Sequence, residues 1–169
     1  MRIRPLVIAG ALLLSCTALT STAVIGHADS NARPLTGSFA SVSPCSTPCF
    51  SFAGQLSHLG SFTGQITGFS LPGGTSPSCP VVPPPTPGVE AGCTTATWTA
   101  ANGDTVTDYT IFYITGFDAG TGMFTFSQAI QITGGTGRFA GATGSATATG
   151  ETTGTFSQYY GTINGTIGY

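Results

Sequence analysis

A glycine-dense corner between two strand-like runs is the feature of this sequence that most constrains its fold. In residues 123–132 Phe124, Phe126, Ile130 and Ile132 share one face, and Thr125, Ser127 and Gln131 take the other. This period of two indicates a half-buried strand. Gly134, Gly135 and Gly137 follow, and glycine permits the positive φ angles that a sharp turn requires. Residues 143–149 then alternate hydroxyl side chains with Gly and Ala. The pattern predicts two strands joined by a tight corner.

Similar strand-like segments recur along the rest of the chain. Including the two at the corner, they are residues 35–42, 50–58, 61–70, 93–101, 105–115, 123–133, 143–151 and 155–169. Asn102-Gly103-Asp104 is a strong hairpin turn, in which we expect Asp104 to serve the turn itself. Eight antiparallel strands close into a barrel whose interior is just filled or holds one small ligand. We therefore predict an all-β fold, a single eight-stranded antiparallel β-barrel over residues 35–169, with Phe139 plugging one end.

The corner sequence Gly-Gly-Thr-Gly-Arg-Phe-Ala-Gly-Ala-Thr-Gly at 134–144 resembles a corner found in a known superfamily. It is similar to the strand-to-strand corner of the allene oxide cyclase and dirigent proteins, and most of all to bacterial exported proteins predicted to share that calycin-like barrel. Allene oxide cyclases isomerise a fatty-acid epoxide, and dirigent proteins steer phenoxy-radical coupling. Their functional polar residues lie outside the corner, so none is transferred to this chain. Related barrels often form trimers, which makes a homotrimer an expectation.

Residues 1–28 have the pattern of an export signal. Positive charge precedes an apolar run at 5–14, and small residues up to Ala28 suit cleavage there. The run is too short for a membrane anchor, so we expect no transmembrane segment in the mature chain. Cleavage would leave an N-terminal tail at 29–34 and a secreted, extracytoplasmic protein. A lipid anchor at Cys16 is the alternative.

The four cysteines that follow the signal are predicted to form disulfides. They are Cys45, Cys49, Cys79 and Cys93, and three pairings are possible. We favour Cys45–Cys49 and Cys79–Cys93, because each closes a local loop between strands. A zinc site is disfavoured, since no second pair with suitable spacing accompanies Cys45 and Cys49.

Residues 71–92 are rich in proline and interrupt the strand pattern. Proline fixes φ and removes a backbone donor, so this segment cannot join the interior of a sheet. We expect an extended surface loop that lies across one barrel mouth or serves as an adhesive surface.

The charge of the chain excludes one class of partner. It has four basic and six acidic side chains in all, and nucleic-acid binding requires basic side chains that displace counterions from phosphates. The glycines of the corner lack the lysine of a phosphate-binding loop, and a strand rather than a helix follows them. We expect no nucleic acid, no cofactor and no metal.

Four side chains are the candidates for a ligand site. His58 is expected at a strand end on the apolar face. Asp108 belongs to a strand for which the sequence does not decide which face points into the barrel. Arg138 lies in the corner, where we expect it to bond carbonyl groups or an acid such as Glu151. Trp98 shares a face with small residues, so its ring would lie in the core or floor a pocket.

These features favour a non-catalytic function. The aromatic content, the small-residue strand and the lack of paired catalytic groups suggest an exported barrel that binds a small apolar or aromatic ligand, or an envelope-associated module. The alternatives are a cyclase or isomerase that shapes a hydrophobic substrate, and a surface adhesion module that uses the proline-rich loop.

Overall fold

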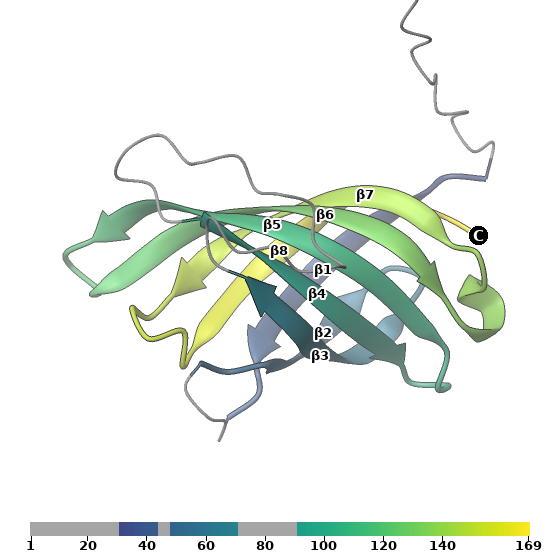
Figure 1. Cartoon of the computed structure of the whole chain (residues 1–169), viewed down its shortest axis with the longest axis horizontal. Helices are drawn as coiled ribbons and strands as arrows, with labels where there is room; N and C mark the ends of the chain where they lie inside the picture. Colours follow the sequence, from purple (N-terminus) through teal and green to yellow (C-terminus); the bar gives the residue numbers. More distant parts are fainter. Residues whose placement is uncertain (1–30, 44–47, 71–90) are drawn as a thin grey trace, which may run out of the picture.

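The chain forms a closed β-barrel. The computed structural model describes residues 31–43, 48–70 and 91–169 (Figure 1). Each strand pairs antiparallel with the next, and the last pairs with the first to close the sheet. The strands are β1 (Arg33–Ser41), β2 (Ser51–Leu56), β3 (Gly60–Ser70), β4 (Ala91–Ala100), β5 (Thr105–Asp118), β6 (Met123–Gly135), β7 (Thr143–Thr152) and β8 (Tyr159–Gly168). The predicted single eight-stranded antiparallel barrel is confirmed. Within the described residues, no helix is long and apolar enough to cross a membrane.

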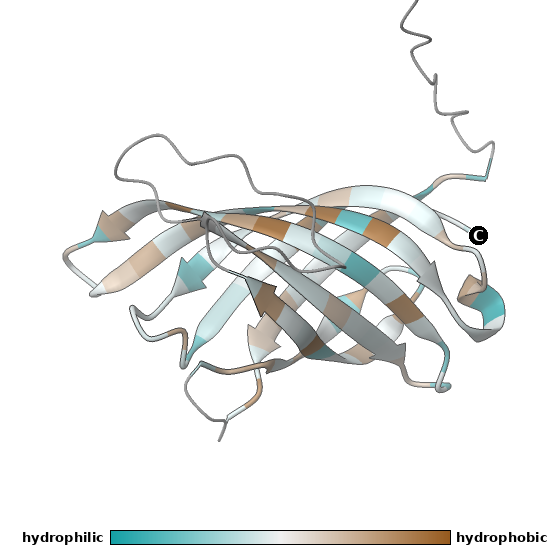
Figure 2. Ribbon diagram, viewed as in Figure 1, coloured by the Kyte–Doolittle hydropathy of each residue, from teal (hydrophilic) through white to brown (hydrophobic). Residues whose placement is uncertain are grey.

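The period of two in the sequence becomes the inside and the outside of the barrel. On β5 the buried positions are Val106, Asp108, Thr110 and Phe112, whereas the residues between them are half-exposed. Hydrophobic and polar residues alternate in the same way along most strands (Figure 2). Because successive side chains of a strand point to opposite faces, every second side chain of each strand points into the core.

Large and small side chains meet in the barrel interior. The ring of Phe39 lies 6.2 Å from Phe52 and 6.4 Å from Phe126, centroid to centroid. On β7 the inner face carries the buried Ala146 and Ala148 instead. Small residues on one wall leave room for rings from the others, which is how small barrels are filled. The small residues of the alternation at 143–149 thus face the interior, and the hydroxyl side chains face outward.

The corner follows β6 and is built differently from the prediction in one respect. Gly134 and Gly135 belong to β6, because they pair with β5, and of these three glycines only Gly137 has a positive φ (+58°). Gly135 is needed for close approach, since an added Cβ would lie 2.1 Å from the carbonyl oxygen of Thr105. A short 3-10 helix, η1 (Gly137–Phe139), then places the Phe139 ring in the core with no exposed surface. The predicted plug is confirmed.

Several element boundaries also differ from the prediction. Strand β1 begins at Arg33, inside the predicted tail, because Arg33 pairs with Ile167 of β8. Residues 155–158 form a turn with Phe156 at φ +53°, so β8 begins only at Tyr159. Residues 91–92 of the predicted proline-rich loop belong to β4, and residues 71–90 lie outside the described part of the chain.

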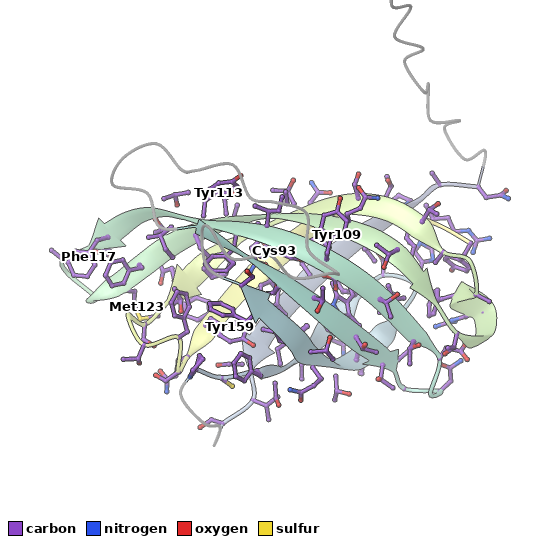
Figure 3. The ribbon with its side chains drawn as sticks, viewed as in Figure 1. Cys93, Tyr109, Tyr113, Phe117, Met123 and Tyr159 are labelled. Carbon is purple, nitrogen blue, oxygen red and sulfur yellow. The ribbon has the colours of Figure 1, made fainter. Side chains whose placement is uncertain are left out.

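The barrel has two unlike ends, which we call the corner end and the cavity end. The corner end carries the connections at 57–59, 101–104 and 136–142 and the C-terminus, and the cavity end carries those at 119–122 and 153–158 and the last residues of β1 and β3. The hairpin of β5 and β6 extends furthest at the cavity end (Figure 1). Phe117 and Met123 lie near its tip (Figure 3).

Candidate functional site

Two of the four predicted site residues lie at the corner end and fasten it. The guanidinium of Arg138 donates a hydrogen bond to the carbonyl oxygen of His58 (2.6 Å), and its Nε lies 3.7 Å from Oδ2 of Asp104. The prediction that Arg138 bonds a carbonyl is confirmed, but the acid is Asp104 and not Glu151, because Glu151 lies at the opposite end and accepts from the hydroxyl of Tyr160. His58 occupies a turn with φ +70° instead of a strand.

Asp104 joins its hairpin to the corner. Its Oδ2 accepts hydrogen bonds from Asn102 Nδ2 (2.7 Å) and from the backbone N–H of Arg138 (3.3 Å). The carboxylate therefore serves the turn, as predicted, and also the neighbouring corner. Asp104, His58 and Arg138 act together as a structural clamp.

The other two predicted residues, Trp98 and Asp108, line a cavity inside the barrel, whose outer part reaches the cavity end. The cavity has two adjoining parts, an outer chamber of about 70 Å³ and an inner chamber of about 40 Å³. They share the lining residues Ile66, Thr94, Gln128 and Tyr159. The structure thus separates the predicted site residues into two groups, one at the corner end and one inside the barrel.

The outer chamber is almost entirely apolar. Its main lining residues are Phe50, Ile66, Phe69, Phe112, Phe126 and Phe156. The ring of Phe112 stacks on Phe69 at 5.9 Å and meets Phe156 edge-on at 6.0 Å. Rings held in this way give a rigid apolar surface that suits a flat or aromatic ligand.

The inner chamber has a polar floor in an apolar setting. Its polar lining residues are Thr94, Trp98, Asp108, Thr110, Gln128 and Tyr159. The hydroxyl of Tyr159 donates to the carbonyl oxygen of Ser51 (3.4 Å), and burial raises the pKa of this phenol to about 12. Tyr159 therefore stays neutral across the physiological range.

Asp108 is a buried acid on this floor. It is 4% exposed, and its Oδ1 accepts a hydrogen bond from the Thr110 hydroxyl at 2.9 Å. Its Oδ2 is buried and has no hydrogen-bond partner among the described residues. Burial raises the pKa of the carboxyl to about 7, and the polar contacts to Thr110 and Trp98 offset only part of that increase. Below that pH the group is neutral and can donate a proton.

Trp98 supplies a second buried polar atom at the same place. The residue is 2% exposed, and its indole nitrogen has no hydrogen-bond partner among the described residues. The indole lies near enough to Asp108 to lower the pKa of that carboxyl, yet the two groups do not complete a hydrogen bond. Trp98 pairs with Val106 and Ala96 with Asp108, so the two side chains are diagonal neighbours on one face.

A β-bulge adjoins Asp108. The pairing of β5 with β6 shifts between Thr107 and Asp108, which leaves Thr133 as the extra residue of β6. The Thr133 hydroxyl donates to the carbonyl oxygen of Thr107 (3.2 Å) and so holds the bulge. Bulges bend a strand and re-aim the side chains next to them, and they are frequent beside functional sites.

Sequence reasoning missed Thr110, Gln128 and Tyr159 as members of the site. A signal for Gln128 was present, because it has the same parity as Phe126 and Ile130 on the apolar face of β6. A polar side chain at an apolar position of a strand is a marker of a polar site inside a barrel. Thr110 lies two residues after Asp108 and therefore on the same face of β5, so the inward position of one predicts that of the other.

One of the described cysteines, Cys49, lines the outer chamber. Cys49 and Cys93 are both buried, whereas Cys45 and Cys79 lie outside the described part of the chain, so the disulfide pairing stays a prediction. In residues 31–43, 48–70 and 91–169, no group of three or more His, Cys, Asp or Glu side chains is placed to hold a metal ion.

Comparison with known proteins finds no match: no protein-family model, no curated protein and no solved structure matches this chain. The resemblance to allene oxide cyclase and dirigent proteins therefore rests on the corner sequence, and it stays a prediction. Function has to be argued from the cavity itself.

Proposed function

We propose that this chain is exported and binds a small, mainly apolar molecule in the two chambers of its barrel. The observation that carries the proposal is the aromatic outer chamber that adjoins an inner chamber with unpartnered polar atoms. Binding sites for small molecules commonly combine apolar walls with a few convergent polar groups. The motif-based resemblance also favours a barrel with a ligand in its interior.

The volume of the chambers limits the size of the ligand. Sites for drug-sized molecules measure about 300–1,000 Å³. The two chambers here measure about 70 and 40 Å³. The ligand is accordingly compact, such as a single ring with one substituent, or a longer molecule with most of its body outside the barrel.

The single tryptophan of the sequence gives a direct test of binding. Trp98 lines the inner chamber, so its fluorescence and its indole N–H resonance should respond to a compact apolar probe such as toluene. Thr94→Phe fills the position shared by both chambers and should abolish the response. Thr97→Phe, on the outward face of the same strand, is the matched control and should leave the response intact. A folded protein whose Trp98 signals ignore toluene would refute the proposal.

Isomerisation or cyclisation of a hydrophobic substrate is the second candidate, and Asp108 favours it. A buried carboxyl with a pKa near 7 can give a proton to one atom of a substrate and take one back from another, with no net change of protons or electrons. If turnover is found, Asp108→Asn should abolish it while toluene still binds. Unchanged turnover would exclude Asp108 as the acid.

Export, disulfides and assembly belong to the same proposal and can be measured together. We expect the mature chain to begin at Asp29, to contain Cys45–Cys49 and Cys79–Cys93 disulfides, and to form a homotrimer. Native mass spectrometry of the exported protein reports the cleavage site, the oxidation state of the cysteines and the subunit number. A mass increment for a lipid at Cys16 would replace simple secretion by a lipid anchor.

A further inference from the structure

From the floor of the inner chamber we infer that the ligand carries an uncharged oxygen acceptor, such as a carbonyl or ether oxygen, which receives hydrogen bonds from the Trp98 indole and the Asp108 carboxylic acid. The inference rests on the proposed binding function and specifies the chemical class of the ligand. It concerns recognition, and it holds whether or not the ligand is transformed.

The two polar atoms are the first argument. Trp98 Nε1 and Asp108 Oδ2 are the only buried side-chain polar atoms without a hydrogen-bond partner in the described residues. Both belong to side chains that line the inner chamber. Buried polar atoms in native proteins are nearly always paired, so two orphans side by side in one chamber indicate that a ligand atom or a water pairs with them.

The chemistry of the two atoms is the second argument. An indole N–H can only donate a hydrogen bond. Oδ1 of Asp108 already accepts from Thr110, which leaves Oδ2 as the oxygen that carries the proton when the acid is neutral. Two donors that converge on one chamber require an acceptor from the ligand, and a single oxygen has lone pairs for both.

The surrounding charges are the third argument. The inner chamber is lined from β1, β2, β3, β4, β5, β6 and β8, and Tyr159 is the only titratable group besides Asp108 among its described lining residues. The described arginines, Arg33 and Arg138, lie at the corner end and bond Tyr169 and His58. An anionic ligand would therefore lose its hydration without gaining a counter-charge, so the site favours a neutral oxygen.

Three probes of similar size separate recognition of the oxygen from binding as such. Toluene has no acceptor, acetophenone has a neutral carbonyl, and benzoate is an anion at pH 5.5. At that pH we expect acetophenone to bind at least tenfold more tightly than toluene, and benzoate to bind more weakly than acetophenone. The indole N–H resonance of Trp98 should move downfield with acetophenone and not with toluene, because only the ketone accepts its hydrogen bond.

Variants then identify the donors. Asp108→Leu and Trp98→Phe should each reduce the affinity for acetophenone to nearly that for toluene, measured by ligand-observed NMR, with toluene binding retained. Asp108→Asn keeps a donor of the same size and should retain most of the preference. Thr97→Val, on the outer face of β4, is the control and should change neither affinity.

The dependence on pH gives a signature that packing alone would not produce. From pH 5.5 to 8.5 the acid loses its proton, so the preference for acetophenone should fall several-fold while toluene binding stays constant. Asp108→Asn should remove this dependence. Tyr159, the other titratable lining residue, stays neutral throughout because its pKa is raised to about 12.

The outcomes distinguish the two proposals. Equal binding of toluene and acetophenone, with no downfield shift of the indole resonance specific to acetophenone, overturns the inference and leaves the binding function standing. Tighter binding of benzoate than of acetophenone also overturns it, in favour of an anionic ligand. A folded protein that binds none of the probes refutes both.

Discussion

The corner end and the cavity end of this barrel use the same kinds of residue in opposite ways. At the corner end every polar group named above is fastened: Asp104 binds Asn102 and Arg138, and Arg138 binds His58. In the chambers that reach the cavity end, Asp108 and Trp98 each keep a buried polar atom without a hydrogen-bond partner among the described residues. The difference indicates that the polar groups of the corner end stabilise the fold, whereas those of the inner chamber are left unpartnered, at a cost in stability, and are available to a ligand.

The apolar residues show the same division. At the corner end Phe139 has no exposed surface and stacks edge-on against Tyr169 at 4.9 Å. The large hydrophobic side chains that the described part of the chain exposes all lie at the cavity end: Val42, Phe69, Phe117 and Tyr160. One end completes the core, and the other leaves apolar surface around the chambers.

Removal of the plug should have the largest effect on stability. Phe139→Ala deletes a fully buried ring, and such substitutions lower the free energy of unfolding by about 3–5 kcal/mol through lost burial and the cavity left behind. Urea unfolding followed by circular dichroism measures the loss. A loss below about 1 kcal/mol would mean that the corner does not seal the barrel.

Asp108→Asn should have the next largest effect, and in the opposite direction. Burial raises the pKa of Asp108 in the folded protein from 3.8 to about 7, so between these values the folded state binds more protons than the unfolded state. Stability therefore falls as pH rises from about 4 to 7 and stays low above that, by at most about 4 kcal/mol. Asn carries no charge and is free of this loss.

Unfolding of both proteins at several pH values measures this effect. At pH 8.5 we expect Asp108→Asn to be about 2–4 kcal/mol more stable than the wild type, with the gain reduced to about 1 kcal/mol or less at pH 4.5. A gain that does not depend on pH would show that the carboxyl does not titrate in this range. It would also remove the contrast between Asp104, which is hydrogen-bonded at the corner end, and Asp108, which keeps an unpartnered oxygen in the inner chamber.

The sequence predicted the corner end better than the cavity, for a physical reason. The plug and the strands follow from local patterns: a glycine corner, a period of two and hairpin turns. The inward direction of Asp108 was left open, because β5 carries large side chains on both faces and Tyr109 and Tyr113 make the outer face look like a core face as well. In the structure these two tyrosines lie on the outer side of the barrel (Figure 3). The partners of Arg138 come from distant parts of the chain, and no local pattern specifies them.

Loss of the clamp should have a smaller effect than loss of the plug. Arg138→Ala removes a hydrogen bond to His58 and an ion pair with Asp104, both in a partly exposed setting. We expect a decrease of about 0.5–1.5 kcal/mol in the free energy of unfolding, reduced at high salt because exposed ion pairs are screened. Binding of toluene should be unchanged, since Arg138 lines neither chamber. A change in affinity would show that the two ends are coupled.

Phe117→Ser should have the smallest effect, although it removes the same type of side chain as Phe139→Ala. Phe117 is 58% exposed and its ring contacts Phe124 at 4.8 Å at the cavity end. Because little apolar surface is buried there, the free energy of unfolding should fall by less than about 1 kcal/mol. The same unfolding experiment compares the two phenylalanines directly. A loss as large as that of Phe139→Ala would place Phe117 in a packed core in solution, and the division of the barrel into a sealed end and a binding end would then be wrong.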